Sequence, residues 1–273
     1  MLQDWIIEHS DIFRMSAFLT LLALFAVTEW LFPRRKSYGY KPRRWFSNLS
    51  IVAINVGLLR LVFPLLAVEV SFITVEKGWG LFQLVGWPGW LNFGCSILIL
   101  DVAIYMQHVM FHAVPTLWRI HKVHHTDLDF DVTTGVRFHP IEIIISMGIK
   151  IMTVIAFGIS PIAIIIFEVL LNGSSMFTHT NIKLPLGLDR VVRWLIVTPD
   201  MHRIHHSTEM RERNSNYGFN LSLWDRLFGT YRQNPQVDHP DMELGTPAFR
   251  NPKYLKINWL FLIPFLQDRH HKD

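Results

Sequence analysis

Long apolar runs divide this chain and constrain its fold more than any other feature. They cover about residues 12–32, 49–73, 91–107 and 141–171. A helix of about 20 apolar residues is long enough to cross a bilayer. Half of the 273 residues are hydrophobic and the mean hydropathy is +0.25, which is too apolar for an ordinary soluble domain. The sequence therefore predicts an all-α integral membrane helical bundle.

Charge and chain breaks predict the topology. Residues 34–44 hold six basic residues and no acidic one, so the positive-inside rule places them in the cytoplasm. The run at 91–107 then leaves the membrane on that same side. The run at 141–171 is interrupted at Gly158-Ile159-Ser160-Pro161, which predicts a hairpin of two helices or one sharply kinked helix. A hairpin would return the segment after residue 171 to the cytoplasm. The N-terminus is expected outside, because the run at 12–32 crosses the membrane before the cytoplasmic residues 34–44.

Composition excludes several classes of function. The net charge of +4 is typical of basic cytoplasmic loops, and no basic run is interleaved with aromatic residues, so we expect no nucleic-acid partner. Cys95 is the only cysteine, which rules out internal disulfides and cysteine-ligated clusters. The sequence has no H-E-x-x-H, G-x-S-x-G or Walker motif, so nothing indicates a metalloprotease, a serine hydrolase or a nucleotide site.

Three histidine clusters carry the chemistry. An H-x-x-x-H pair is followed by two H-x-x-H-H boxes: His108 and His112; His121, His124 and His125; His202, His205 and His206. Residues three and four apart share one face of a helix, so each cluster aims its imidazoles at one point. Imidazole is a favoured ligand of iron, zinc and copper. Adjacent histidines point about 100° apart around a helix and can serve two neighbouring metals.

Other polar residues near the boxes have more than one interpretation. His179 follows the hairpin and is a candidate ligand, whereas His139 is either a ligand or a group that orients one. Asp101 lies on the stripe of His108 and either accepts a hydrogen bond from a ligand imidazole or pairs with Arg60. Trp118 is expected to pack at the membrane interface. The remaining histidines have no ligand spacing: His9, His239, His270 and His271, the last two in a solvated tail.

Two redox metals beside a membrane suit oxygen activation and oxidation of a C–H bond in an apolar substrate. One alternative is a metal-dependent membrane lipid hydrolase. The other is a non-enzymatic metal transporter, although its ligands should cross the membrane midplane, whereas these histidines lie at helix ends and in polar segments.

The combined motifs resemble the fatty acid hydroxylase / sterol desaturase superfamily of integral-membrane di-iron oxidoreductases. The matching residues are His108-x-x-x-His112, Trp118-Arg119-x-His121-x-x-His124-His125, Arg137-Phe138-His139-Pro140-x-Glu142, Phe177-x-His179-x-Asn181, Thr198-Pro199-x-x-His202-Arg203-x-His205-His206-Ser207 and Asn216-Tyr217-Gly218-x-Asn220-Leu221-x-x-Trp224-Asp225-x-x-Phe228-Gly229-Thr230. The resemblance implies a transmembrane stem at 1–90, a catalytic region at 91–232 with a histidine-rich cytosolic helical cap, and a tail at 233–273.

The resemblance also implies the components of the reaction. These are two iron ions, O2 as co-substrate, hydroxylation or desaturation of a sterol, fatty acyl or related lipid, and electrons from a separate cytochrome b5-like protein, ferredoxin or reductase. It makes the three clusters and His179 the metal ligands. Asp101, His139 and Asn181 are the candidate catalytic residues, of which Asp101 and His139 would tune the metals from outside the ligand set. Some relatives have a further histidine shortly before His179, where this chain reads Asn172-Gly173-Ser174-Ser175. One metal is therefore expected to have one ligand fewer, or to use water.

Overall fold

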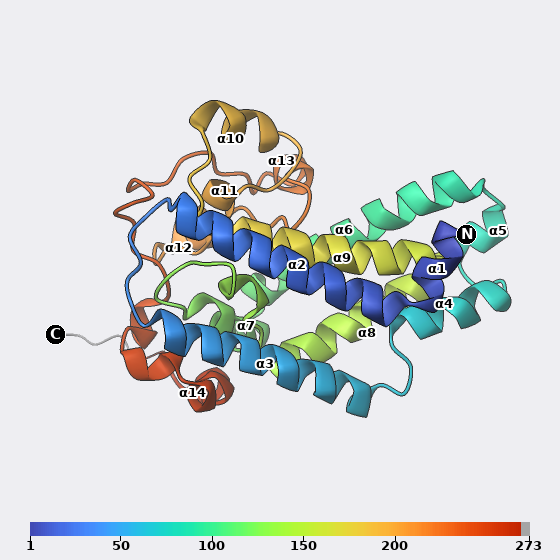
Figure 1. Cartoon of the computed structure of the whole chain (residues 1–273), viewed down its shortest axis with the longest axis horizontal. Coiled ribbons are helices and arrows are strands. Elements are labelled where there is room, and N and C mark those ends of the chain that lie inside the picture. The colour runs from blue at the N-terminus through green and yellow to red at the C-terminus, as the bar shows by residue number, and fades with distance from the viewer. Residues whose placement is uncertain (269–273) are drawn as a thin grey trace.

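The computed structural model describes residues 1–268, and these residues form helices and connecting segments but no strands. Five segments are long and apolar enough to cross a membrane, the second continuing through two shorter helices to Val85. Their long helices run along the length of the molecule (Figure 1): α2 (Ser10–Leu31), α3 (Lys41–Val62), α6 (Gly89–Ala113), α8 (Pro140–Phe157) and α9 (Pro161–His179). The predicted all-α integral membrane bundle is confirmed.

The two ends of the bundle differ (Figure 1). One end carries the N-terminus and three short helices: α1 (Leu2–Glu8), α4 (Ala67–Glu76) and α5 (Leu81–Val85). The other end carries the cap, which we define as residues 114–139 and 180–268. Its helices are α7 (Pro115–His125), η1 (Thr134–Val136), α10 (Leu186–Val192), α11 (Pro199–His205), α12 (Met210–Arg213), α13 (Leu223–Leu227), η2 (Pro247–Phe249), η3 (Pro252–Leu255), α14 (Ile257–Leu262) and η4 (Ile263–Phe265). The basic α2–α3 connection lies at the cap end, where Arg34 pairs with Asp200 at 3.0 Å.

The break at residues 158–161 is a tight reversal between two helices, as the hairpin alternative predicts. Gly158 ends α8 with φ +71°, and Pro161 opens α9 at its first turn. A Cβ on Gly80 would lie 2.1 Å from the Gly158 nitrogen, so only glycine permits α5 to pack this closely on the turn. The chain reverses at this turn, so α8 runs away from the cap end and α9 runs back to it. His179, the last residue of α9, therefore lies at the cap end (Figure 1).

Charged side chains inside the bundle pair across helices. Glu168 of α9 accepts from Lys150 Nζ of α8 at 2.7 Å and is also paired with Arg14 of α2. A charge within the hydrocarbon region is costly unless it is neutralised by a partner. This cluster therefore joins three of the long helices without leaving an isolated charge.

Candidate metal centre

The histidines of the three predicted clusters, together with His179, converge into two adjacent groups at the cap end of the bundle. Within each group, one ligand atom of every residue lies within 4.8 Å of the others. The first group holds five histidines and the second holds four: His108, His112, His121, His125 and His205; His124, His179, His202 and His206. All nine predicted ligand residues thus fall in one group or the other, and the smaller group is the one that contains His179.

Helix geometry explains how the boxes feed both groups. α7 and α11 each start with proline at the first helical position, and the Thr198 side chain caps α11 by accepting from the Met201 N–H at 3.3 Å. The adjacent histidines at the end of each box then diverge. His124 belongs to the four-histidine group and His125 to the five-histidine group. The second box divides its pair in the reverse order, with His205 in the five-histidine group and His206 in the four-histidine group.

Hydrogen bonds orient three imidazoles of the five-histidine group. Each places Nδ1 against an acceptor outside the group: His108 on the Tyr217 carbonyl (2.7 Å), His121 on Glu142 (2.7 Å) and His205 on the Ser215 carbonyl (2.7 Å). With the hydrogen on Nδ1, each Nε2 carries a lone pair. Yet His108 Nε2 lies 3.2 Å from His121 Nε2 and 3.1 Å from His205 Nε2. Lone pairs this close repel unless a cation lies between them.

The four-histidine group repeats this arrangement around His179. Its Nδ1 donates to the Ser175 carbonyl at 2.6 Å, which leaves a lone pair on Nε2. That Nε2 faces three other Nε2 atoms: those of His206 (3.0 Å), His124 (3.1 Å) and His202 (3.2 Å). Here the carbonyl of Ser175, rather than its hydroxyl, orients the imidazole.

Burial keeps these groups neutral and able to bind metal. Both ring nitrogens of His112 and of His125 are buried and have no hydrogen-bond partner among the described residues. Burial, reinforced by neighbouring histidines, holds the pKa well below its ordinary value for the ligand candidates of the cap: His124, His125, His202, His205 and His206. Neutral imidazoles with unused lone pairs fit two transition-metal ions, one per group.

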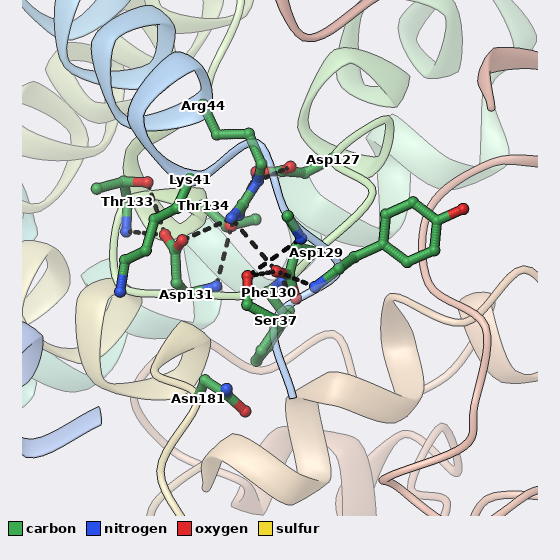
Figure 2. A network of polar contacts seen from close by, with 12 residues as sticks. Ser37, Lys41, Arg44, Asp127, Asp129, Phe130, Asp131, Thr133, Thr134 and Asn181 are labelled. Atoms are coloured by element: carbon green, nitrogen blue, oxygen red, sulfur yellow. Dashed lines mark hydrogen bonds and ion pairs between the residues drawn. The ribbon is translucent and has the colours of Figure 1, made fainter. Parts of the chain in front are cut away.

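The loop after the first H-x-x-H-H box is held by a buried ion-pair network that the sequence analysis missed (Figure 2). The Arg44 side chain of α3 is fully buried, pairs with Asp127, and donates to Asp131 Oδ2 at 2.7 Å. Burial opposes ionisation of Asp127, but the charges of Arg44 and Arg137 outweigh it and lower the pKa of that carboxyl to about 2. The alternation Asp127-x-Asp129-x-Asp131 was a signal of a carboxylate cluster, but it did not indicate Arg44, 83 residues earlier, as the partner.

This network has a direct connection to the histidine groups. Phe130 lies between two of its aspartates, and its ring centroid is 5.2 Å from those of His179 and His206. The ion pairs of Arg44 therefore position a ring that packs on the four-histidine group. Figure 2 shows Arg44 reaching toward Asp127 and Asp131 from its helix, with Phe130 in the same loop.

Asp101 has neither of the two partners that the sequence suggested. It accepts three hydrogen bonds from the segment after the last box: Asn220 Nδ2 (2.7 Å), Trp224 Nε1 (2.7 Å) and the Leu221 N–H (3.3 Å). Arg60 instead pairs with Asp11 and Glu69, each at 3.2 Å. Asp101 thus fastens the 220–224 segment to α6, and α6 carries two of the ligand candidates.

His139 and Asn181 lie outside both histidine groups. His139 is the N-cap of α8, where its Nδ1 accepts from the Ile141 N–H at 3.2 Å. Asn181 binds the α2–α3 connection, accepting from the Arg35 N–H at 3.1 Å and donating to the Arg35 carbonyl at 2.7 Å. Both side chains thus hydrogen-bond to backbone groups, and their roles as candidate catalytic residues stay predictions.

Trp118 packs on the five-histidine group, and its place at a membrane interface stays a prediction. Its ring centroid is 4.9 Å from that of His112 and 5.3 Å from that of His125, and the Arg213 guanidinium lies 4.7 Å above it. Of the solitary histidines, His239 is buried in the cap, whereas His270 and His271 lie outside the described residues.

Comparison with known proteins agrees with these features. The family model of the fatty acid hydroxylases matches residues 93–230, which is half of the chain and spans all nine histidines. The chain belongs to the fatty acid hydroxylase family. No solved structure matches it significantly.

Among curated proteins, the chain is similar to lipid hydroxylases and monooxygenases. It is 26% identical over 233 residues to the ornithine lipid hydroxylase OlsE of Rhizobium tropici, covering 82% of this chain and 69% of that protein. It is 32% identical over 204 residues to the alkylglycerol monooxygenase of Xenopus tropicalis, covering 71% and 43%. It is 27% identical over 142 residues to human cholesterol 25-hydroxylase, covering 50% and 49%. The chain thus spans less than half of the length of the last two relatives.

Proposed function

We propose that this protein is a membrane enzyme that uses O2 to oxidise a C–H bond of a lipid, by hydroxylation or desaturation. The two histidine groups would hold two iron ions. The observation that carries this proposal is the convergence of Nε2 atoms at 3.0–3.2 Å in both groups, a spacing that suits ligand atoms sharing one cation. The names of the similar proteins, hydroxylase and monooxygenase, favour oxidation over hydrolysis.

The bound irons would supply O2 activation and electron transfer, which protein side chains alone lack. The chain's own residues would bind the irons and orient the imidazole ligands. Nine imidazoles supply the ligands, and Tyr217, Ser215, Ser175 and Glu142 fix which ring nitrogen is free. Eight of the nine histidines are at most 2% exposed, which restricts water around the reacting groups. The exposed apolar helices next to the cap provide lateral access for a lipid.

We further propose that the metal centre faces the cytoplasm. The basic residues of the 34–44 segment lie at the cap end of the bundle, and such residues are retained on the cytoplasmic side. A centre on that side is accessible to a separate electron donor of the cytochrome b5, ferredoxin or reductase type.

Lipid mass spectrometry tests the reaction. Lipids from cells that make the protein should gain one oxygen atom, or lose two hydrogen atoms, relative to cells without it. The variant His125→Asn should abolish this change and reduce bound iron. The control His139→Asn should keep both, because asparagine also caps helices. Lipid cleavage that proceeds with zinc and without O2 would overturn the proposal in favour of a hydrolase, and metal uptake without lipid change in favour of a transporter.

A further inference from the structure

A charged cavity lies in the cap, on the face of α11 away from the histidine groups. Its volume is about 460 Å³, and it is lined by α10, the start of α11, residues 233–240 and Arg34 of the α2–α3 connection. The side chains that matter here are Arg34, Asp189, Arg190, Arg193, Asp238 and His239. Asp200, which also lines it, is two residues before His202, but its carboxylate lies against Arg34, Arg203 and, at 3.6 Å, His239 Nε2 rather than against the two histidine groups.

Part of this charge is neutralised within the wall. Arg193 pairs with Asp189 one helical turn earlier, and Arg34 Nε lies 3.0 Å from Asp200 Oδ2. Two opposite charges remain, because neither Arg190 nor Asp238 forms an ion pair with any residue in the described part of the chain. The cavity therefore offers one free cation and one free anion.

Buried polar atoms in the wall also lack partners. Asp189 Oδ1, Arg193 Nε and His239 Nδ1 make no hydrogen bond to the described residues, although these residues are only 5%, 9% and 9% exposed. A buried donor or acceptor without a partner is costly, and such a cost is usually met by a ligand or an ordered water. Arg193 Nε is a hydrogen-bond donor, Asp189 Oδ1 is an acceptor, and His239 Nδ1 can be either. A ligand that satisfies all three atoms must therefore both accept and donate hydrogen bonds.

These features select the charge type of the ligand. A purely anionic group would face the carboxylates of Asp189 and Asp238, and a purely cationic group would face Arg190 and Arg193. A group with both charges can pair each with its opposite, and charge-assisted hydrogen bonds are the stronger kind. The lining therefore fits a zwitterion.

The outer surface of the same cap region indicates where the ligand comes from. α10 and the turn after it expose a set of large apolar side chains, which α13 continues: Leu186, Leu188, Val191, Trp194, Leu195, Leu223, Leu227 and Phe228. Leu186, Val191 and Trp194 are 72%, 70% and 68% exposed. α10 and α13 lie at the cap end of the molecule and project sideways from the bundle (Figure 1). An apolar helix face beside membrane-spanning helices is suited to the lipid interface.

We propose that this cavity binds a zwitterionic polar group, presented by a membrane lipid headgroup. With the apolar face of α10 in the leaflet, the charged face of the same helix lies at headgroup depth and turns Asp189 and Arg193 into the cavity. The site would recognise an ammonium through Asp189 and Asp238 and a phosphate or carboxylate through Arg190 and Arg193. This inference goes beyond the proposed oxidation and depends on neither the metals nor O2.

Binding of defined lipids to the full-length protein in a non-ionic detergent, followed by native mass spectrometry, tests the proposal. The probes are short-chain phosphatidylethanolamine, which carries both charges, phosphatidylglycerol, which is anionic only, and soluble glycerophosphoethanolamine. The test variant combines Arg190→Gln with Asp238→Asn, and both residues are exposed, so the fold is not at risk. The matched control combines Arg211→Gln with Glu209→Gln, two exposed charges outside the cavity.

We expect phosphatidylethanolamine to bind more tightly than phosphatidylglycerol. The test variant should weaken its binding by about tenfold or more for each lost contact, and the control should leave it unchanged. Equal binding of the soluble headgroup would identify a free zwitterion as the source, with the same recognition. Tight binding of the anionic lipid, or full binding by the test variant, would overturn the proposal. Bound metal and lipid oxidation, measured on the same samples, report separately on the proposed function.

Discussion

Replacement of Arg44 tests how strongly the buried ion-pair network stabilises the centre. Arg44 is 0% exposed and is paired with Asp127 and with Asp131 at 2.7 Å. Arg44→Met keeps most of the volume of the side chain but leaves two buried carboxylates without their cation. Removing one partner of a buried pair costs about 3–5 kcal/mol. For a chain of this size such a loss corresponds to a fall in Tm on the order of 10 °C.

The assay is thermal unfolding of the purified protein in detergent, together with analysis of bound metal. Arg43→Met is the matched control, because Arg43 precedes Arg44 on α3 and its side chain is exposed. Arg44→Lys should fall between the two variants, since lysine keeps the charge but lacks the planar fork that reaches two carboxylates. We expect Arg44→Met to release metal as well, because the loop it holds carries Phe130 against His179.

A second substitution separates charge from packing. In the Arg44→Met background, Asp127→Asn removes one uncompensated charge and should recover part of the lost Tm. The reasoning is refuted if Arg44→Met unfolds within about two degrees of the Arg43→Met control, which would mean a cost below about 1 kcal/mol.

Three other perturbations have defined outcomes. Gly135→Ala would place a Cβ 2.4 Å from a backbone carbonyl of α9 and should lower bound metal, whereas Gly148→Ala, with nothing within 4 Å, should leave it unchanged in the same metal analysis. Burial lowers the pKa of His239 from 6.5 to about 4, so the unfolded chain binds the proton first and stability falls as pH drops from about 6.5 to about 4. The loss relative to neutral pH reaches about 3 kcal/mol below about pH 4, and His239→Gln should flatten the plot of Tm against pH; parallel plots would contradict it. Asp101→Asn replaces one carboxylate oxygen with an NH2 group that faces the N–H donors of the 220–224 segment. The lost hydrogen bond should lower the free energy of unfolding by about 1–3 kcal/mol. Glu69→Gln, in an exposed pair, should stay close to the wild-type Tm.

The histidine groups were predictable because their geometry is local. Spacings of three and four residues determine which side chains share a helix face, whatever the rest of the chain does. The division of His124 and His125 between the two groups follows from the same rotation about the helix axis. The membrane helices were predictable for a similar reason, since length and hydropathy are properties of one segment.

Partners that depend on distant packing were not predictable. Asp101 binds donors about 120 residues away, and no local pattern links α6 with the 220–224 segment. Arg44 meets Asp127 in the same way, across separate elements. His139 is a different case, because the proline that follows it is a local sign of a helix start, and a histidine in front of that sign can serve as a cap.

The distribution of the nine histidines over α6, α7, α9 and α11 has a consequence for biogenesis. The N-terminal ligands leave the ribosome long before His202, His205 and His206 are made, and α8 and α9 are inserted in between. The five-histidine group cannot be complete before residue 205 is made, nor the four-histidine group before residue 206. Loading of the proposed metals would therefore follow insertion of the hairpin formed by α8 and α9.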